Sequence, residues 1–391
     1  MHYVEIILLV GAAVIFYSYA GYGLILWIWY LVKKIFRQSQ AAPDAPFQPP
    51  VTLIIPAYNE EAFIEEKILN SLALEYPEGH LKILVVTDGS TDKTLEIVAR
   101  FPTVELLQSQ ERTGKVAAID RAMKMVKTDF VIFSDANTYL NKDCLHHLMN
   151  HYRNPEIGGV AGEKKIIPTA GNIAGQGEGL YWQYESFLKK MDAEFYTVVG
   201  AAGELFSIRT SLYEYPGTDV LLDDFIISLK VCLKGYRVAY EPRSYAMEMP
   251  SLSIREEQKR KTRISAGAFQ SIFRLPQLFN FFRHPRLSFQ YISHRVLRWT
   301  LCPVFLVVIF LANVWLVYRR PDSLNITFLA IQSGFYLLAL LGWITSSWKQ
   351  RVRFLFIPYY FVFINFSLFA GFYQYIRGRQ TVLWEKAKRH T

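Results

Sequence analysis

Cysteine is scarce in this 391-residue chain, and charged residues make up only 20% of it. The three cysteines, Cys144, Cys232 and Cys302, lie far apart and lack metal-ligand spacing, which excludes a disulfide framework and a zinc site and indicates a reduced compartment. The formal net charge is +9, yet the basic residues form no stripe with interleaved aromatics. We therefore exclude nucleic acid as a partner.

Apolar residues form 51% of the chain and are concentrated near its two ends. Residues 6–32 contain no charged side chain, which is enough to span roughly 30 Å of hydrocarbon. Trp27, Trp29 and Tyr30 supply an interfacial aromatic belt, and basic residues follow directly. A cleaved signal peptide is the alternative, but the run is too long and the basic residues lie on the wrong side. We predict an uncleaved transmembrane anchor with a basic flank over residues 1–40, followed by a cytosolic domain.

Three further apolar stretches predict up to three transmembrane helices within residues 299–376, because each is about long enough to cross. They cover residues 299–318, 326–348 and 354–376. The basic linker 349–353 is expected in the cytosol, so we predict a multi-pass protein of the cell (inner) membrane. If all three stretches cross, the basic tail 377–391 lies outside, against the positive-inside rule. Either one stretch is re-entrant or interfacial, or the tail is a tolerated exception.

Residues 266–298 mix Phe and Leu with Arg and His, and their apolar positions recur at helical spacing. This pattern predicts an amphipathic segment that lies in the membrane interface. A helix packed on the soluble domain is the alternative.

The middle of the chain, residues 50–265, alternates between apolar runs and helical periods. The expected strands are 51–58, 82–88, 104–109 and 130–135, with helical patterns between them. Strand and helix in alternation predict an α/β fold, a Rossmann-like and mostly parallel sheet with helices on both faces, flanked by transmembrane α-helices.

Polar clusters follow three of the predicted strands, and ligands of such sheets bind outside the carboxyl ends of the strands. Asp88 can accept hydrogen bonds from a base or ribose, while Arg112 and Lys115 can counter the charge of a diphosphate. Asp135 and Asn137, two residues apart after an apolar strand, offer oxygen ligands suited to Mg²⁺ or Mn²⁺. Together these residues predict a nucleotide-diphosphate site with a divalent cation.

Several short motifs, in one order along the chain, carry a resemblance to a known family. They are IIPAYNEE (54–61), DGSTDKT (88–94), RTGK (112–115), SDANT (134–138), GAAGELFSIR (200–209), LLDD (221–224) and QKRKTR (258–263). The series resembles the inverting family-2 glycosyltransferases with a GT-A catalytic domain, over about residues 50–275. With its membrane segments, the chain is similar to the membrane-integrated synthases of that family, including those for poly-N-acetylglucosamine, hyaluronan and cellulose.

The resemblance implies roles for individual residues. Those expected to contact the donor are Pro56, Tyr58, Glu60, Asp88, Lys115 and Asp135. Asp135 and Asn137 are implied as the metal motif, and Asp224 as the catalytic base. The residues expected near the acceptor or the diphosphate are Gly203, Glu204, Asp223, Gln258, Arg260 and Lys261.

Asp223 and Asp224 stand before an apolar-periodic stretch, so both are expected at a helix N-terminus. One Asp would satisfy the capping of that helix. The second can face a cleft and deprotonate an acceptor hydroxyl. The choice of Asp224 rests on the family position, and Asp223 stays the alternative.

The chain departs from the family pattern at three places. Thr87 stands where many members have the first Asp of a pair, and Asn137 replaces the second Asp of the usual DxD. Thr262 stands where processive members carry the Trp of QxxRW. Catalysis survives this last change more easily than polymerisation does.

We predict a membrane glycosyltransferase that moves a sugar from a nucleotide diphosphate donor, expected to be a UDP-sugar, to a glycan or lipid-linked acceptor with inversion, in cell-surface or extracellular polysaccharide synthesis. The expected partners are this donor, this acceptor, the lipid bilayer and an export partner. One alternative is single-sugar transfer to a polyprenyl or ceramide-like lipid. The alternative of another class is a non-catalytic membrane scaffold or exporter, against which intact Asp135, Asp224 and Lys115 argue.

Overall fold

The computed structural model describes most of the chain in two compact units. The described residues are 2–36, 45–167, 173–250, 253–345 and 353–378. One unit comprises residues 30–169 and 178–252, and the other comprises residues 1–29, 170–177 and 253–380.

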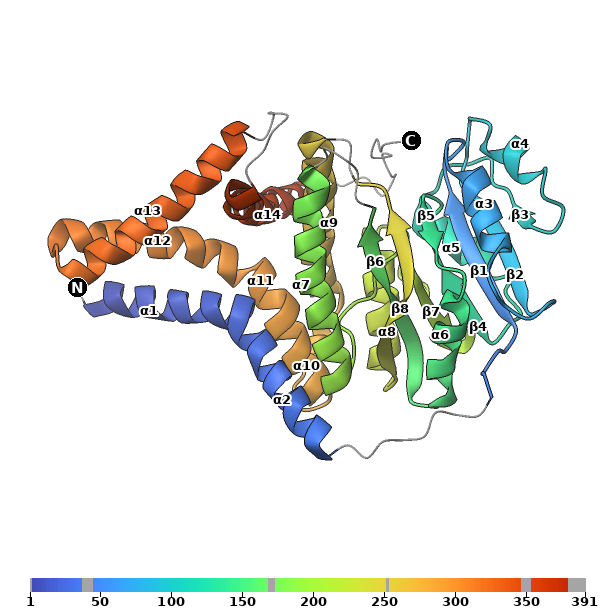
Figure 1. The fold of residues 1–391 in the computed structure, drawn as a ribbon, viewed down its shortest axis with the longest axis horizontal. Helices are drawn as coiled ribbons and strands as arrows, with labels where there is room; N and C mark the ends of the chain where they lie inside the picture. Colours follow the sequence, from blue (N-terminus) through green and yellow to red (C-terminus); the bar gives the residue numbers. More distant parts are fainter. Residues whose placement is uncertain (1, 37–44, 168–172, 251–252, 346–352, 379–391) are drawn as a thin grey trace. The chain divides into compact units, whose positions relative to one another are not determined.

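The first unit is built on a sheet of eight strands in the order β3-β2-β1-β4-β7-β6-β8-β5 (Figure 1). The strands are β1 Val51–Ala57, β2 Leu81–Thr87, β3 Glu105–Leu107, β4 Phe130–Phe133, β5 Thr138–Leu140, β6 Ile157–Ile166, β7 Phe206–Arg209 and β8 Arg237–Glu248. Strands β1 to β4 are parallel neighbours, β7 runs antiparallel to β4 and β6, and β5 runs antiparallel to β8. The sheet is therefore mixed, with its parallel half formed by the four strands that the apolar runs predicted.

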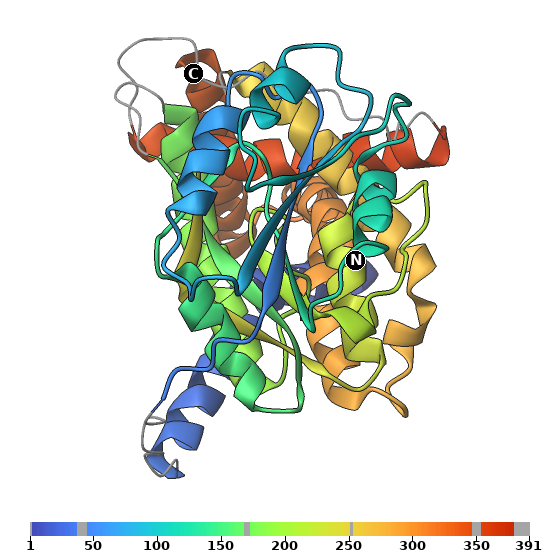
Figure 2. The same ribbon diagram turned by 90° about the vertical axis from the view of Figure 1, so that its right-hand side faces the viewer.

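Helices follow these strands as the sequence predicts. They are α3 Ile64–Leu72, α4 Thr94–Val98, α5 Lys115–Met123, α6 Cys144–Asn150, α7 Ile173–Phe195 and α8 Asp223–Leu233. Figure 2 shows the twist of the sheet and the helices on either side of it. The loops after β1, β2 and β3 thus lead into helices, the loop after β4 leads into β5, and these loops carry the polar motifs.

Side chains of the central strands alternate between two buried layers. Leu53 and Ile55 of β1 pack in one core with residues of α3, α4 and α6. Because successive strand residues point to opposite faces, the buried Ile54 lies on the other face, where α5 contacts β1 and β2. Both faces of β1 are thus covered, which explains its uninterrupted apolar sequence.

The second unit is helical. A single helical segment, His2–Phe36, is continuous through α1 His2–Phe16, a π-turn at Tyr17–Gly21 and α2 Tyr22–Phe36. The other long helices are α9 Ile254–Arg274, α12 Leu301–Arg319, α13 Ser323–Ile344 and α14 Arg353–Ile376. By length and composition, four helices of the described residues can cross a membrane: the N-terminal segment, α12, α13 and α14. The predicted apolar spans are all helical, whereas the tail from residue 379 onward lies outside the described residues.

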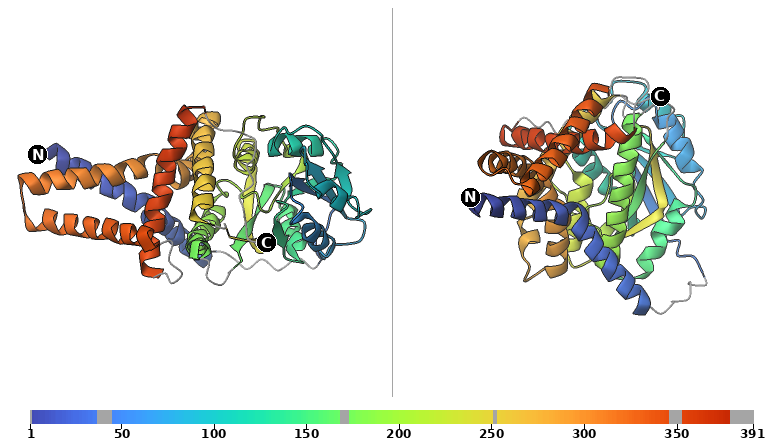
Figure 3. Two further views of the ribbon diagram at one scale, coloured as in Figure 1. Left: turned by 90° about the horizontal axis from the view of Figure 1, so that it is seen from above. Right: turned by 60° about the vertical axis from the view of Figure 1, so that its left-hand side comes forward.

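Glycines bring these helices into close contact. In Figure 3, α1 lies beside α12, and α12 forms a hairpin with α13. A Cβ added to Gly11 would lie 2.5 Å from Ile309 of α12, and one added to Gly342 would lie 2.4 Å from the Leu355 carbonyl oxygen of α14. Small residues of this kind allow close backbone approach between membrane helices. Asn313, fully buried, donates to Gln332 Oε1 at 2.9 Å, which adds a polar contact between α12 and α13.

The predicted interfacial segment 266–298 is mostly helical. It contains the end of α9, a short 3₁₀ turn, α10 Pro285–Tyr291, a π-turn and α11 Leu297–Trp299. Its side chains divide sharply: Leu278 and Leu287 are buried, whereas Phe273 is 64% exposed and Phe282 is fully exposed. The segment is amphipathic, and its place in the membrane interface stays a prediction.

Candidate active site

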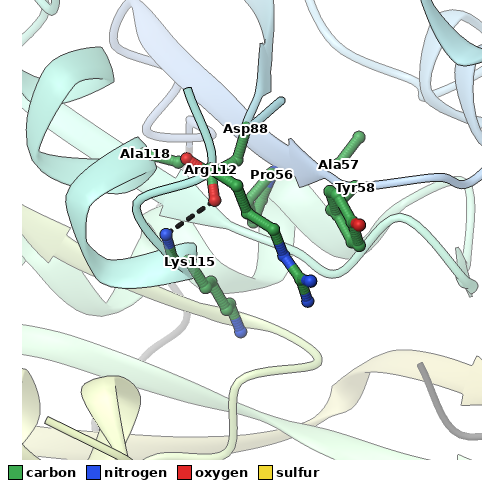
Figure 4. A pocket seen from close by; sticks show the side chains of 8 residues that line it. Pro56, Ala57, Tyr58, Asp88, Arg112, Lys115 and Ala118 are labelled. Carbon is green, nitrogen blue, oxygen red and sulfur yellow. Dashed lines mark hydrogen bonds between the residues drawn. The ribbon is translucent and has the colours of Figure 1, made fainter. Parts of the chain in front are cut away.

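A pocket lies at the carboxyl ends of β1 and β2. It is lined by Pro56, Ala57, Tyr58, Asp88, Arg112, Gly114, Lys115 and Ala118. Figure 4 shows the side chains that line it. Four of the residues predicted to contact the donor thus share one pocket: Pro56, Tyr58, Asp88 and Lys115. Glu60 follows in the same loop and is not among the described residues that line the pocket. It is buried, and its backbone nitrogen donates to Thr94 Oγ1 at 2.8 Å.

Asp88 is buried, and its carboxylate holds the neighbouring loop. The backbone nitrogens of Thr113 and Gly114 donate to it at 3.1 and 2.6 Å. The Thr113 hydroxyl donates at 2.9 Å, and Arg121 of α5 donates at 3.1 Å. The sequence interpretation foresaw the position of Asp88 but not this set of partners. Asp88 therefore fixes the turn from which Arg112 and Lys115 reach the pocket, and its contact with a nucleotide stays a prediction.

Arg112 and Tyr58 form one wall of the pocket. The Arg112 guanidinium carbon lies 4.0 Å from the centre of the Tyr58 ring, within the range of a cation–π contact (Figure 4). Gly89, at a φ of +68°, allows this turn to approach, because a Cβ there would lie 2.9 Å from the Arg112 backbone nitrogen. The wall offers an aromatic face and a fixed positive charge side by side.

Lys115 lies at the first position of α5 and is close to carboxylates from the turn after β4 and from α8. Its Nζ donates to Asp135 Oδ1 at 2.7 Å and lies 3.6 Å from Asp223 Oδ2. Burial opposes the charged form of Lys115, but Asp135, Asp223 and Asp224 outweigh it and hold the pKa of this lysine above its usual range. The lysine is thus a permanent cation next to the pocket.

Asp223 and Asp224 occupy the first turn of α8, as predicted. Asp224 Oδ1 accepts a hydrogen bond from the Phe225 nitrogen at 2.8 Å, and the buried Asp223 Oδ2 accepts none from the described residues. Burial and the adjacent Asp223 raise the pKa of Asp224 to about 7, despite the counteracting Lys115. A carboxyl with a pKa near neutrality is suited to accept a proton and later release it.

Gly203 lies directly against this pair. A Cβ on Gly203 would lie 3.3 Å from both Asp224 Oδ2 and Lys115 Nζ. The missing side chain therefore leaves room between the predicted base and the cation. That residues 203 and 204 lie near the acceptor stays a prediction.

Glu204 faces the opposite direction, toward a buried lysine. Lys164 of β6 donates to both Glu204 and Glu248, and its Nζ lies 5.0 Å from the centre of the Trp182 ring. Glu204 also adds to the negative charge felt by Asp135 and Asp224. Glu204 therefore contributes to the electrostatic field of the site while it ties its own loop to β6, and Lys164 also joins β6 to β8 through Glu248.

The residues at the predicted metal motif fit a hard divalent cation. Asp135 and Asn137 offer oxygen donors from one turn after β4. Burial raises the pKa of Asp135 and outweighs the opposing Lys115, and Glu204 and Asp223 raise it further, so a divalent cation would favour the charged carboxylate here. Among the described residues, no three His, Cys, Asp or Glu side chains converge enough to hold an ion alone. A cation here would therefore need further oxygens, such as those of a diphosphate.

Gln258, Arg260 and Lys261 lie near the start of α9, in the helical unit. Lys261 is buried and lies 3.8 Å from Glu257, and Arg260 lies 3.6 Å from the same carboxylate. These three residues are thus not in the compact unit that holds the pocket, and their service to a diphosphate stays a prediction.

Two functional candidates escaped the sequence interpretation. Arg121 binds Asp88, and Lys67 of α3 is fully buried beneath the turn that carries Asp135. The signal for Lys67 was available, because it shares one helix face with Ile64, Ile68 and Ser71, all of them buried. A lysine on a buried face requires polar partners. Arg121 gave no comparable signal.

Comparison with solved structures defines the class of this fold. A mannosyltransferase from Pyrobaculum calidifontis, solved in complex with GDP-Man and Mn²⁺, aligns with a TM-score of 0.74 over 96% of this chain and 100% of that one, at 21% sequence identity. The mixed sheet with its flanking apolar helices is a GT-A glycosyltransferase fold, as predicted.

The family follows from the sequence. Residues 52–215 match the glycosyl transferase family 2 model, so the chain contains a family 2 glycosyltransferase domain. It is 26% identical over 238 residues to a poly-β-1,6-N-acetyl-D-glucosamine synthase of Staphylococcus aureus and 24% identical over 234 residues to that of Staphylococcus epidermidis. Each match covers 57% of this chain and 56% of the relative, so the chain spans about half the length of the curated relatives it matches.

Proposed function

We propose that this protein is a membrane glycosyltransferase that transfers a sugar, with inversion, from a nucleotide diphosphate donor to a glycan acceptor in polysaccharide synthesis. The observation that carries the proposal is the convergence of Asp135, Asp223 and Asp224 on Lys115, beside a pocket with an aromatic face and a second cation. A diphosphate complements these cations, and a hydroxyl acceptor requires a base.

The donor would be held by this chain's own groups. We place the nucleoside against Tyr58 and the diphosphate near Arg112 and Lys115. Asp135 and Asn137 would hold Mg²⁺ or Mn²⁺, which would supply charge neutralisation for the departing diphosphate. Binding of the donor phosphates would also draw Lys115 away from its carboxylate partners.

Asp224 would act as the base. Its carboxylate accepts the proton of an acceptor hydroxyl while that oxygen bonds to the anomeric carbon of the donor sugar. The bond from this carbon to the diphosphate oxygen breaks, and the nucleoside diphosphate leaves with the electron pair. Because attack and departure occur on opposite sides of the carbon, one displacement inverts its configuration. The open space beside Gly203 leaves room for the incoming hydroxyl.

The relatives' names guide the choice of substrate. Their poly-β-1,6-N-acetyl-D-glucosamine product makes N-acetylglucosamine on a uridine nucleotide the first donor to test. We further propose that the domain faces the cytosol, that the protein is a multi-pass protein of the inner membrane, and that the product leaves through this protein or an export partner. The basic residues after the N-terminal span support this orientation.

Single-sugar addition to a lipid-linked acceptor is the second candidate. It is favoured by Thr262, a small residue on α9 where processive members carry Trp, because an acceptor sugar has no ring to stack on at that position. The length of the product separates the two candidates: a ladder indicates a polymerase, and a single addition indicates lipid glycosylation.

The decisive experiment uses the full-length protein in membranes with radiolabelled nucleotide sugars, Mn²⁺ or Mg²⁺, and product sizing. We expect transfer from a UDP-sugar. Asp224→Asn should lower kcat by about 10²- to 10⁴-fold, the range for loss of a general base, while the Kd for the donor changes little. Full activity in Asp224→Asn would overturn the base assignment. Absence of transfer and of donor binding in the wild-type protein would favour a scaffold or exporter.

A further inference from the structure

Lys67 forms a polar contact network beneath the predicted metal turn. Its side chain is fully buried, and its Nζ lies 2.7 Å from Ser134 Oγ, 3.0 Å from the Thr138 carbonyl oxygen and 3.3 Å from Thr138 Oγ1. These acceptors match the three N–H donors of a protonated lysine. Burial lowers the pKa of Lys67 to about 7, and Asp135 counteracts this effect.

Ser134 and Thr138, the two residues that bind Lys67, stand at the two ends of the turn that carries Asp135 and Asn137. Thr138 closes this turn, because its hydroxyl donates to the Asp135 carbonyl oxygen at 2.8 Å and its backbone nitrogen donates to the same oxygen at 3.4 Å. Lys67 joins both ends of the turn from below. The direction in which Asp135 presents its carboxylate therefore depends on a side chain from α3.

Ser134 extends the network to a second loop. Its hydroxyl donates to the Glu204 carbonyl oxygen at 2.9 Å. Because protonated Lys67 can only donate, the Ser134 hydrogen must point away from it, which favours this bond. Gly203, the residue before Glu204, faces Asp224 and Lys115. One serine thus links the metal turn to the loop beside the predicted base.

We propose that Lys67, through Ser134, is a positioning residue that fixes the position of the metal turn 134–138 relative to the 203–204 loop. This rests on the proposed function, because it assigns the network a role in presenting the donor's cation to the reaction. Burial of a lysine is unfavourable because its charge loses water, and an apolar side chain could fill the same space without that cost. Control of the turn's geometry accounts for a lysine at this position.

A purely structural lysine would behave differently from a positioning residue. It would lower thermal stability when replaced, without a specific effect on the cation. The matched control is Thr52→Val, which removes a buried 2.8 Å hydrogen bond to Thr128 at the opposite end of β1. Both substitutions disturb buried polar groups of the same compact unit, Lys67 on α3 and Thr52 on β1, but only Lys67 contacts the metal turn.

The test measures Mn²⁺ affinity in the presence of UDP, and in parallel GDP, by calorimetry and by the Mn²⁺ electron paramagnetic resonance signal, together with kcat and KM for the donor. In Lys67→Met we expect Mn²⁺ affinity and kcat to fall by about 10- to 100-fold, as for groups that orient metal ligands. Lys67→Arg, which keeps the donors, should recover part of this loss. Thr52→Val should lower the unfolding temperature without a change in Mn²⁺ affinity.

Ser134→Ala provides an independent variant if Lys67→Met fails to fold. It should lower Mn²⁺ affinity and kcat on its own. Where Lys67→Met does fold, the two effects should be non-additive, because the two residues act through one network. The positioning role is overturned if Lys67→Met, or Ser134→Ala in its place, binds Mn²⁺ as tightly as Thr52→Val does. If the wild-type protein binds neither nucleotide with Mn²⁺, the proposed function fails and the role of Lys67 fails with it.

Discussion

Two carboxylate regions lie close to the pocket, and they differ in how their charges are paired. Around Asp88, backbone N–H groups, a hydroxyl and the Arg121 guanidinium fill both carboxylate oxygens. Around Lys115, the three carboxylates of Asp135, Asp223 and Asp224 share one lysine. The Asp88 carboxylate has all its hydrogen-bond partners within the protein, whereas three carboxylates around Lys115 share a single cation.

This difference separates structure from chemistry. A carboxylate whose partners are all present fixes a loop and gains nothing from a ligand. Burial, together with neighbouring carboxylates, raises the pKa values of Asp135 and Asp224 despite the counteracting Lys115, so these carboxylates gain from a divalent ion or an incoming proton. We therefore assign loop geometry to the Asp88 region and reaction chemistry to the Asp135 region, and three predictions test this assignment.

Between the two regions, the largest expected effect on Mn²⁺ binding belongs to Asp135→Asn. The substitution keeps the shape of the side chain and removes the charge that a divalent cation requires. We expect transfer to fall by about 10²- to 10³-fold, the scale for loss of a preorganised electrostatic group, and nucleotide-dependent Mn²⁺ binding to be lost. Initial rates and calorimetric titration of Mn²⁺ in the presence of UDP measure the two effects.

The folded state should tolerate this change. A neutral amide at position 135 would lose the ion pair with Lys115, but its oxygen can still accept that hydrogen bond, and the change removes the burial cost of the charge and the repulsion from Glu204 and Asp223. The free energy of unfolding should therefore stay within about 1 kcal/mol of the wild-type value. A variant that loses several kcal/mol of stability while it retains Mn²⁺ binding would reverse the assignment of this region.

A pH profile should give the next largest effect. Because Asp224 must be deprotonated to act as the base and its pKa is raised to about 7, kcat should fall about tenfold per pH unit below that value and level off above it. The measurement is kcat from pH 5 to 9 at saturating donor. A flat profile in this range would remove Asp224 from the chemical step.

Stability should change with pH in the opposite direction. The folded-state pKa of Asp224 is raised from 3.8 to about 7, so between these values the folded state binds a proton that the unfolded state has lost. This contribution to stability is present at low pH and is lost as the pH rises through about 7. Thermal unfolding of the metal-free protein should show it, and Asp224→Asn should remove it.

The parallel half of the sheet was predictable from local sequence. Its central strands β1 and β4 are buried apolar runs, β2 is buried over its last five residues, and polar residues at the strand ends meet at one edge by the rules of parallel sheets. The four helices that can cross a membrane were also predictable from local sequence, because length and hydropathy alone identify them. The position of Lys115 between Asp135 and Asp223 was not predictable, because it depends on contacts between the starts of α5 and α8 and the turn after β4, which are distant in sequence.

Residues on loops were predicted by position but not by partner. The motifs placed Asp88 at the pocket, whereas its engagement by residues 113, 114 and 121 depends on the course of the following turn. Strand β7 also lacked a clear signal, since its antiparallel pairing with β4 is set by contacts distant in sequence. Long-range pairing of this kind decides which polar groups are satisfied, and single-sequence patterns do not encode it.

The smallest expected effect on catalysis, and the largest on stability, belongs to Asp88→Asn. The new amide would direct N–H groups toward the Thr113 and Gly114 nitrogens and remove the charge that holds Arg121. Loss of buried, charge-assisted hydrogen bonds should lower the free energy of unfolding by about 1–3 kcal/mol. The donor KM should rise only by about 2- to 5-fold, as the turn that carries Arg112 and Lys115 loosens by less than about 1 kcal/mol of donor binding energy.

Thermal unfolding and the donor KM of Asp88→Asn check this prediction. Asp135→Asn is measured in parallel, because it makes the same chemical change in the other region. Asp88→Asn should lose stability and keep Mn²⁺ binding, whereas Asp135→Asn should do the reverse. If Asp88→Asn instead keeps its unfolding temperature and loses donor binding outright, Asp88 contacts the nucleotide despite its internal partners. A fully satisfied carboxylate would then have to exchange those partners for the ligand, and hydrogen-bond balance would no longer separate the two regions.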